Sequence, residues 1–184
     1  MSNSSWTKQL AENLTSLARN RNKHCRLTEG GTDSDALRIA VVGIGNELNG
    51  DDAAGVMVIR SLEAALEPRP HFLLVDGGPA PENVTGPLRR FQPDLVLLID
   101  AAYLEQPPGS IAWVDWENTE GFSASTHTLP PHVFAEYLIR ETGCQVGVIG
   151  VQPAQLEFAE PMSPPVEEAV RELAHELTNL LSEG

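Results

Sequence analysis

Three aspartates and one histidine stand at the ends of predicted segments, in a pattern that suits a metal or acid–base site. Asp52, Asp76 and Asp100 each come after an apolar run typical of a buried strand, and His127 stands just before a predicted helix. Carboxylates and imidazole bind divalent transition metals such as nickel, zinc and iron. Three such ligands leave one position open for water or a substrate group. The alternative is that these are ordinary polar residues at loop edges.

The first apolar run leads into a glycine-rich loop that carries two carboxylates. Gly43, Gly45 and Gly50 let the backbone turn tightly or approach a ligand, and Asp51 and Asp52 precede an apolar pattern of helical spacing. The third glycine comes too late for a dinucleotide-binding fingerprint, and two acids at a helix start would repel phosphate but suit a cation. We interpret Asp51 as an N-cap. For Asp52, a cation ligand and a first-turn acid favoured by the helix dipole both stay open.

Alternating strand and helix patterns predict an α/β fold, specifically a three-layer αβα sandwich with a mostly parallel five-stranded sheet and one antiparallel edge strand. The predicted strands span residues 38–44, 71–75, 94–99, 110–116 and 145–151. Four helices are predicted after the extension. The first follows Asp52, the second and third span 81–91 and 131–141, and the last begins at Ser163. The strand at 110–116 follows its predecessor too closely for a parallel crossover, so it should be the antiparallel edge. Ligands bind such sheets at the carboxyl ends of strands, where Asp52, Asp76, Asp100 and His127 map.

Composition limits the classes of function. The chain has 184 residues and a formal net charge of -14, which fits one domain at 36–184 and argues against nucleic-acid binding. The sequence has neither an apolar run of membrane-spanning length nor the apolar region of a secretory signal, so we predict a soluble cytoplasmic protein that binds no membrane. Cys25 and Cys144 lack the spacing of a disulfide framework or a zinc ribbon.

Residues 1–35 form a basic N-terminal extension to this acidic domain. Apolar residues recur at helical spacing over 5–20, which predicts an amphipathic helix, and basic residues crowd positions 19–26. The segment 30–34 has the composition of a linker. We interpret the extension as frayed and loosely packed, although it could dock on a partner or a membrane surface.

Five blocks of sequence resemble the hydrogenase maturation proteases, the peptidases that process the large subunit of nickel-iron hydrogenases. They cover the chain from about Leu37 to the C-terminal helix, and they most resemble the branch that serves formate-hydrogenlyase-type enzymes. The blocks are GIGNELNGDDAAG (43–55), DGGPAPEN (76–83), LLIDAAY (97–103), STHTLPPH (125–132) and GVQP (150–153).

The resemblance implies that Asp52, Asp100 and His127 form a metal site that recognises nickel already inserted in the large-subunit precursor. A C-terminal extension of that precursor is then cleaved. The implied enzyme is therefore a hydrolase acting on the precursor, as a monomer, with nickel or another divalent transition metal carried by the substrate. Asp76 lies in a family motif and is interpreted as structural. The N-terminal extension departs from the family pattern, and we expect it to help dock a precursor or chaperone.

Two mechanisms stay open for such an enzyme. A metal could polarise the scissile carbonyl or its water, or an acid could act as general base while the metal only positions the substrate. The chain carries neither the H-E-x-x-H motif of zincins nor the D-T/S-G signature of pepsin-like enzymes. The alternative function is a non-catalytic nickel-checkpoint or chaperone protein that binds the large subunit. A nucleotide-binding enzyme is disfavoured.

Overall fold

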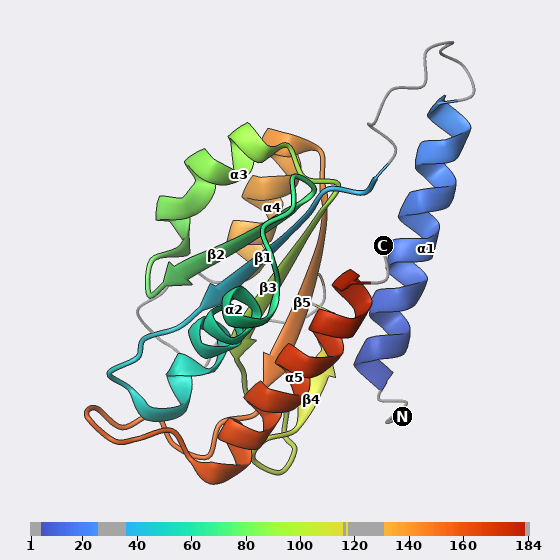
Figure 1. Cartoon of the computed structure of the whole chain (residues 1–184). Coiled ribbons are helices and arrows are strands. Elements are labelled where there is room, and N and C mark those ends of the chain that lie inside the picture. The colour runs from blue at the N-terminus through green and yellow to red at the C-terminus, as the bar shows by residue number, and fades with distance from the viewer. Residues whose placement is uncertain (1–4, 26–35, 116, 118–130, 183–184) are drawn as a thin grey trace.

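The computed structural model describes residues 5–25, 36–115, 117 and 131–182 (Figure 1). Five strands form a sheet in the order β2-β1-β3-β5-β4, in which β4 runs antiparallel to β5 and the other pairings are parallel. The strands are β1 (Ile39–Ile44), β2 (Phe72–Gly78), β3 (Leu95–Ala101), β4 (Ile111–Trp113) and β5 (Gln145–Val151). The predicted mostly parallel sheet with an antiparallel edge strand is therefore confirmed.

Helices cover both faces of this sheet, which completes the three predicted layers (Figure 1). Side chains alternate along each strand, so that Val41 and Leu97 pack with α1, α2 and α5 whereas Val42 and Leu98 pack with α3 and α4. Each face therefore has its own apolar core. The helices are α1 (Ser5–Cys25), α2 (Ala54–Ala65), α3 (Thr85–Phe91), α4 (Pro131–Thr142) and α5 (Pro164–Ser182), with 3₁₀ turns η1 (Gly50–Ala53) and η2 (Pro81–Val84).

Helix α1 is packed into the protein rather than loosely attached to it. Trp6 and Leu10 are only 1% and 3% exposed and belong to the core on the α2–α5 face of the sheet, with Leu14 and Leu17 packed against it. The predicted amphipathic helix is confirmed, but the expected loose packing is wrong because its apolar stripe fills space beside β4 and α5. The proposed boundary between residues 35 and 36 stays a prediction.

Several predicted segments differ in their bounds, among them strand β2, which runs to Gly78 instead of ending at residue 75. Strand β3 continues past the predicted end at residue 99, so Asp100 is part of the sheet. Strand β4 is shorter than predicted, and the predicted helix 81–91 is divided into η2 and α3. Pro87 explains this division, since a proline without an N–H is tolerated in the first turn of a helix and disfavoured in its interior. None of the helices in the described part of the chain has the length and apolar character needed to cross a membrane.

Candidate functional site

Asp52 and Asp100 lie at the carboxyl ends of two adjacent parallel strands. Asp52 is in the η1 turn that follows β1, and Asp100 is the penultimate residue of β3. β1 pairs with β2 on one side and β3 on the other, so the chain departs in opposite directions from the carboxyl ends of β1 and β3. Both carboxylates are almost fully buried, at 3% and 2% exposure. The structure thus brings two of the three predicted site residues together.

Two glycines let the backbone carrying Asp52 lie directly on these strand ends. Gly45 has a φ of 138°, and a Cβ there would come within 1.7 Å of the carbonyl oxygen of Asp52. A Cβ on Gly55, in the first turn of α2, would lie 2.2 Å from the carbonyl oxygen of Ile99 and 2.4 Å from that of Ile44. The glycines therefore do allow a close approach of the backbone, but at Gly45 and Gly55 the backbone approaches other backbone atoms and not a ligand.

One oxygen of the Asp52 carboxylate has no hydrogen-bond partner among the residues that the structure describes. The Oδ2 atom accepts a hydrogen bond from the backbone N–H of Asn46 at 3.1 Å, whereas Oδ1 is buried and finds none among the described residues. Burial raises the pKa of Asp52, against the lowering effects of the Asn46 N–H and the Asn49 side chain. A buried carboxylate oxygen that accepts no hydrogen bond is suited to bind a cation or to share a proton with a neighbouring acid.

The pKa of Asp100 is raised into the neutral range. Its burial, together with the negative charge of Asp52, raises its pKa to about 7, and the backbone N–H of Ala101 only partly offsets this. The influence of Asp52 on Asp100 shows that the two carboxylates act on each other electrostatically. Such a pair can share a proton, bind a divalent cation or transfer a proton in catalysis.

His127, the third predicted ligand, lies outside the described residues. The described residues contain no group of three or more His, Cys, Asp or Glu side chains arranged to hold a metal ion. Its contribution to the site therefore stays a prediction.

Asp51 has a different role from the predicted N-cap, and that interpretation was wrong. Its fully buried carboxylate accepts the backbone N–H groups of Ala154 (2.7 Å) and Gln155 (3.0 Å) at Oδ2. Ser163 donates its backbone N–H to Oδ1 at 2.6 Å and its hydroxyl to Oδ2 at 2.9 Å. No side-chain cap forms at η1, because this carboxylate is used to fasten the loop between β5 and α5 to the turn. Asp51 therefore fixes the backbone of its neighbour Asp52.

Asp76 is set apart from the buried pair. It lies on the outer strand β2 and is exposed, where it accepts the backbone N–H of Gly78 at 3.0 Å and lies 3.8 Å from Arg60. Arg60 is also paired with Glu47. These contacts suit the structural role expected for Asp76.

Gln152 organises the chain beyond Asp100, a role that sequence reasoning missed. This buried side chain follows β5, and its Oε1 accepts the backbone N–H of Leu104 at 2.6 Å while its Nε2 donates to the carbonyl of Pro153 at 3.2 Å. It therefore holds the segment that leaves β3 immediately after Asp100. Its place in the GVQP block was the available signal.

Comparison with known proteins assigns the family. The family model described as hydrogenase maturation protease matches residues 56–180, more than half of the chain. The protein belongs to the hydrogenase maturation protease family. The resemblance carried by the five sequence blocks is thereby confirmed, and the chain is a hydrolase of the hydrogenase maturation endopeptidase class.

Individual family members agree with this assignment. The chain is 34% identical over 128 residues to the hydrogenase 3 maturation protease of Escherichia coli K12, covering 69% of this chain and 80% of that protein. It is similar to the crystal structure of the NiFe hydrogenase maturation protease HycI from Thermococcus kodakarensis, with 34% identity, a TM-score of 0.73 and coverage of 81% and 95% of the two chains. The solution structure of the endopeptidase HycI from Escherichia coli matches with 30% identity, a TM-score of 0.70 and coverage of 80% and 92%. The chain thus shares the fold of these hydrogenase maturation proteases over about four fifths of its length.

Proposed function

We propose that this family member removes the C-terminal extension of a nickel-iron hydrogenase large-subunit precursor after nickel insertion, with nickel as the recognition element. The observation that carries the proposal is the buried pair of Asp52 and Asp100 at the carboxyl ends of β1 and β3. The hydrogenase maturation activity of the relatives supports the choice of substrate.

The acid pair fits a divalent cation that arrives with the substrate. Asp52 offers the unpartnered Oδ1, and Asp100 loses its proton more readily once a positive charge lies nearby. We expect His127 to supply an imidazole, which together with two carboxylates suits nickel or another divalent transition metal. The metal is thus part of the substrate, which anchors the precursor beside the bond to be cut.

Hydrolysis requires a group that takes a proton from the attacking water while the peptide C–N bond breaks. A general base works best when its pKa lies near the working pH, and Asp100, with a pKa of about 7 in the absence of a cation, meets this condition where it does not itself bind the metal. Asp52 keeps a negative charge beside it, which favours the protonated form of Asp100 after transfer. Metal polarisation of the scissile carbonyl is the second route, and the same side chains would serve it.

In the decisive experiment, the purified protein is mixed with nickel-loaded precursor and the masses of the products are measured by mass spectrometry. We expect cleavage by the wild-type protein, none by Asp100→Asn or His127→Ala, and full cleavage by Asp76→Asn, because Asp76 is exposed on β2. Precursor without nickel should stay intact. Equal cleavage with and without nickel would contradict the recognition role of the metal. A precursor that is bound but intact in the wild-type reaction would establish the chaperone alternative.

The same proposal includes a monomeric enzyme acting in the cytoplasm. Support comes from the formal net charge of -14, which opposes self-association, and from the buried free thiol of Cys144, which suits a reducing compartment.

A further inference from the structure

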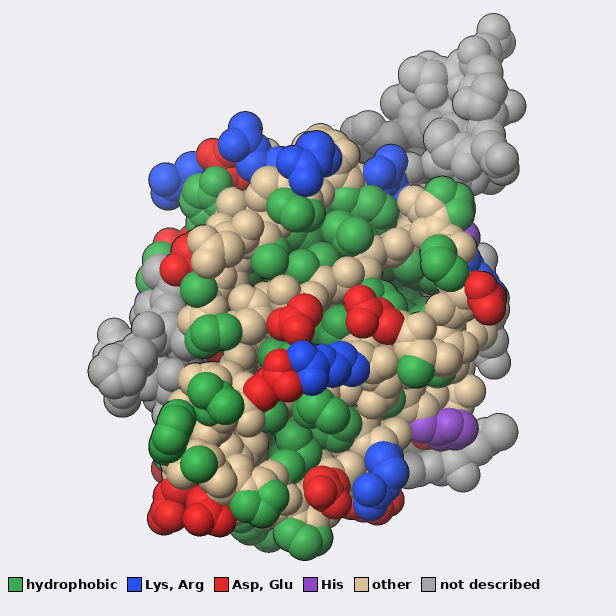
Figure 2. Space-filling model, turned by 60° about the vertical axis from the view of Figure 1, so that its left-hand side comes forward, with side chains coloured by type: hydrophobic (Ala, Val, Ile, Leu, Met, Phe, Trp, Pro, Cys, Tyr) green, Lys and Arg blue, Asp and Glu red, His purple; other side chains and the backbone are tan. Residues whose placement is uncertain are grey.

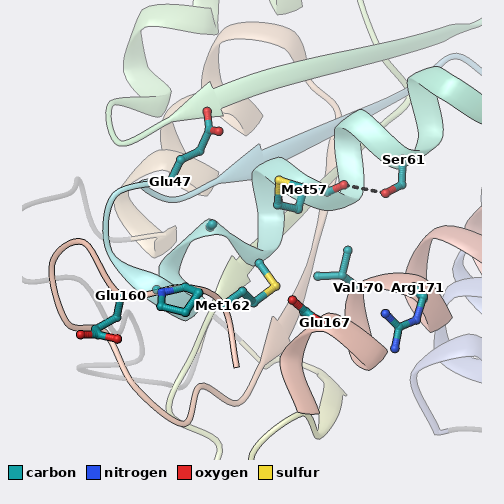
Figure 3. A pocket seen from close by; sticks show the side chains of 11 residues that line it. Glu47, Met57, Ser61, Glu160, Met162, Glu167, Val170 and Arg171 are labelled. Carbon is teal, nitrogen blue, oxygen red and sulfur yellow. Dashed lines mark hydrogen bonds between the residues drawn. The ribbon is translucent and has the colours of Figure 1, made fainter. Parts of the chain in front are cut away.

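A pocket of about 490 Å³ lies between α2, α5 and the loop that precedes α5 (Figure 3). Met57 from α2 and Met162 from the loop lie on opposite walls, and Val170 of α5 adds a third apolar surface. Asp52 and Asp100 are absent from the lining, so this pocket is separate from the acid pair.

The pocket is nevertheless built from the same scaffold as the acid pair. Gly50 and Ala53, the two ends of the η1 turn that carries Asp52, line one side. The opposite side belongs to the loop that Asp51 fastens through Ser163. A group seated here would therefore lie against the backbone that positions Asp52.

The rim of the pocket is acidic. Glu160 and Glu167 line it, and neither lies within ion-pair distance of a basic side chain in the described part of the chain, although the charge of Glu167 acts on the nearby Arg171. A third carboxylate, Glu47, is neutralised by Arg60, and the lining guanidinium of Arg171 is paired with Glu168. The face turned forward in Figure 2 carries acidic and hydrophobic side chains across its middle and lower parts, and basic side chains along its upper edge, at its centre and at its lower right.

Exposed apolar side chains extend the surface beyond the pocket. Leu48 and Phe158 are 58% and 72% exposed, and the backbone N–H of Ala159 donates to the carbonyl of Leu48 at 2.7 Å, which holds the two loops side by side. Large apolar side chains gathered next to a hollow are typical of a surface that binds a partner.

We propose that this pocket docks a segment of the large-subunit precursor that presents an apolar side chain flanked by lysine or arginine. The inference rests on the proposed function and adds a second contact to it, separate from the nickel. Charge complementarity selects the occupant, since an acidic rim around an apolar floor attracts a basic segment and repels a second copy of a chain with a net charge of -14. The chain's own basic stretch falls largely within the C-terminal end of α1, which lies at the end of the molecule where β1 begins and away from the pocket (Figure 1).

The test measures binding of the nickel-loaded precursor by calorimetry in the Asp100→Asn protein, so that cleavage does not remove the complex. We expect the double substitution Glu160→Lys with Glu167→Lys to raise the Kd by at least about tenfold, and the effect to shrink at high salt. Glu136→Lys is the matched control, because this exposed glutamate lies on α4 across the sheet; its Kd should change by less than about twofold. Met57→Gln, a change of similar length at a half-buried position, should weaken binding on its own.

Parallel cleavage assays without the Asp100 substitution separate this inference from the proposed function. If the unsubstituted protein cleaves the precursor but the Kd is the same in all variants, the docking site is wrong and the function stands. If it does not cleave, yet the lysine substitutions weaken binding selectively, the docking site stands and the function is wrong. If the protein shows no cleavage and no binding, both the docking site and the proposed function are wrong.

Discussion

Ser163 donates two hydrogen bonds to the carboxylate of Asp51, at 2.6 Å from its backbone N–H and at 2.9 Å from its hydroxyl. Two further backbone N–H groups, from Ala154 and Gln155, complete a buried anion site within the protein. The acid next to the candidate site residue Asp52 is thus used entirely for structure, and its neighbour is left as the one with an unpartnered oxygen.

We expect Asp51→Asn to destabilise the protein by about 3 kcal/mol, because the amide nitrogen of asparagine would face donors that now bond to a charged oxygen. Ser163→Ala is the milder control and should cost about 1 kcal/mol, since only the hydroxyl bond is lost. Urea denaturation followed by circular dichroism measures both. Equal stability of Asp51→Asn and wild type would show that the loop is held by other contacts.

Asp100→Asn should abolish cleavage yet stabilise the protein at alkaline pH. The pKa of Asp100 is about 7 in the folded protein against an ordinary value of 3.8, so burial of the charged form is penalised. The penalty is absent below about pH 4, grows as the pH rises toward 7 and is constant above it, with an upper bound of about 4 kcal/mol. Thermal melts between pH 4 and pH 8 should therefore show a growing advantage of the variant. An advantage that did not depend on pH would mean that Asp100 is charged throughout.

Trp6→Ala should lower stability by about 3 kcal/mol, because this ring is 1% exposed and lies in the core beside Leu10. Deletion of residues 1–34 should lower stability at least as much, so a loss of precursor binding in that variant could come either from unfolding or from a lost docking contact. Arg19→Glu, at an exposed position of α1, avoids this problem. Unchanged precursor affinity in Arg19→Glu would count against a docking role for this part of the extension, whereas weakened affinity at normal stability would support it.

Gly55→Ala adds only one methyl group, yet it should strongly disrupt the site. The added Cβ would lie 2.2 Å from one backbone oxygen and 2.4 Å from another, and backbone atoms of two buried strands have no room to yield. We expect a loss of several kcal/mol in stability, to be measured by urea denaturation, together with loss of cleavage. Gly86→Ala in α3 is the control, since the nearest atom there is the flexible end of Arg90 at 3.6 Å; it should be neutral or slightly stabilising. Comparable effects of both substitutions would refute the close-approach argument.

The sheet was predictable because buried parallel strands have continuous apolar sequences. The strand at 145–151 has the predicted bounds, and the placement of Asp52 and Asp100 follows from the rule that ligands bind at the carboxyl ends of such strands. Asp100 itself fell outside the predicted strand because an acid ordinarily marks the end of a buried segment. Here burial in the continued strand raises the pKa of Asp100, and the uncharged, protonated form is less costly to bury than the carboxylate.

The contacts between distant segments could not be predicted. The bonds of Asp51 to Ser163 and of Gln152 to Leu104 depend on the arrangement of whole elements, whereas capping and turn patterns in the sequence describe only near neighbours. The burial of Trp6 has the same origin, because a helical stripe indicates an apolar face without indicating what covers it.

The bond between Asp51 and Ser163 joins residues 112 positions apart in the chain, which has a consequence for synthesis on the ribosome. All of the parallel strands precede Ser163, so the sheet can form while the last helix is still inside the exit tunnel. The turn that carries Asp52 gains the bonds from Ser163 only after this residue, directly before α5, has been made. The η1 turn is therefore made early in synthesis but fixed late.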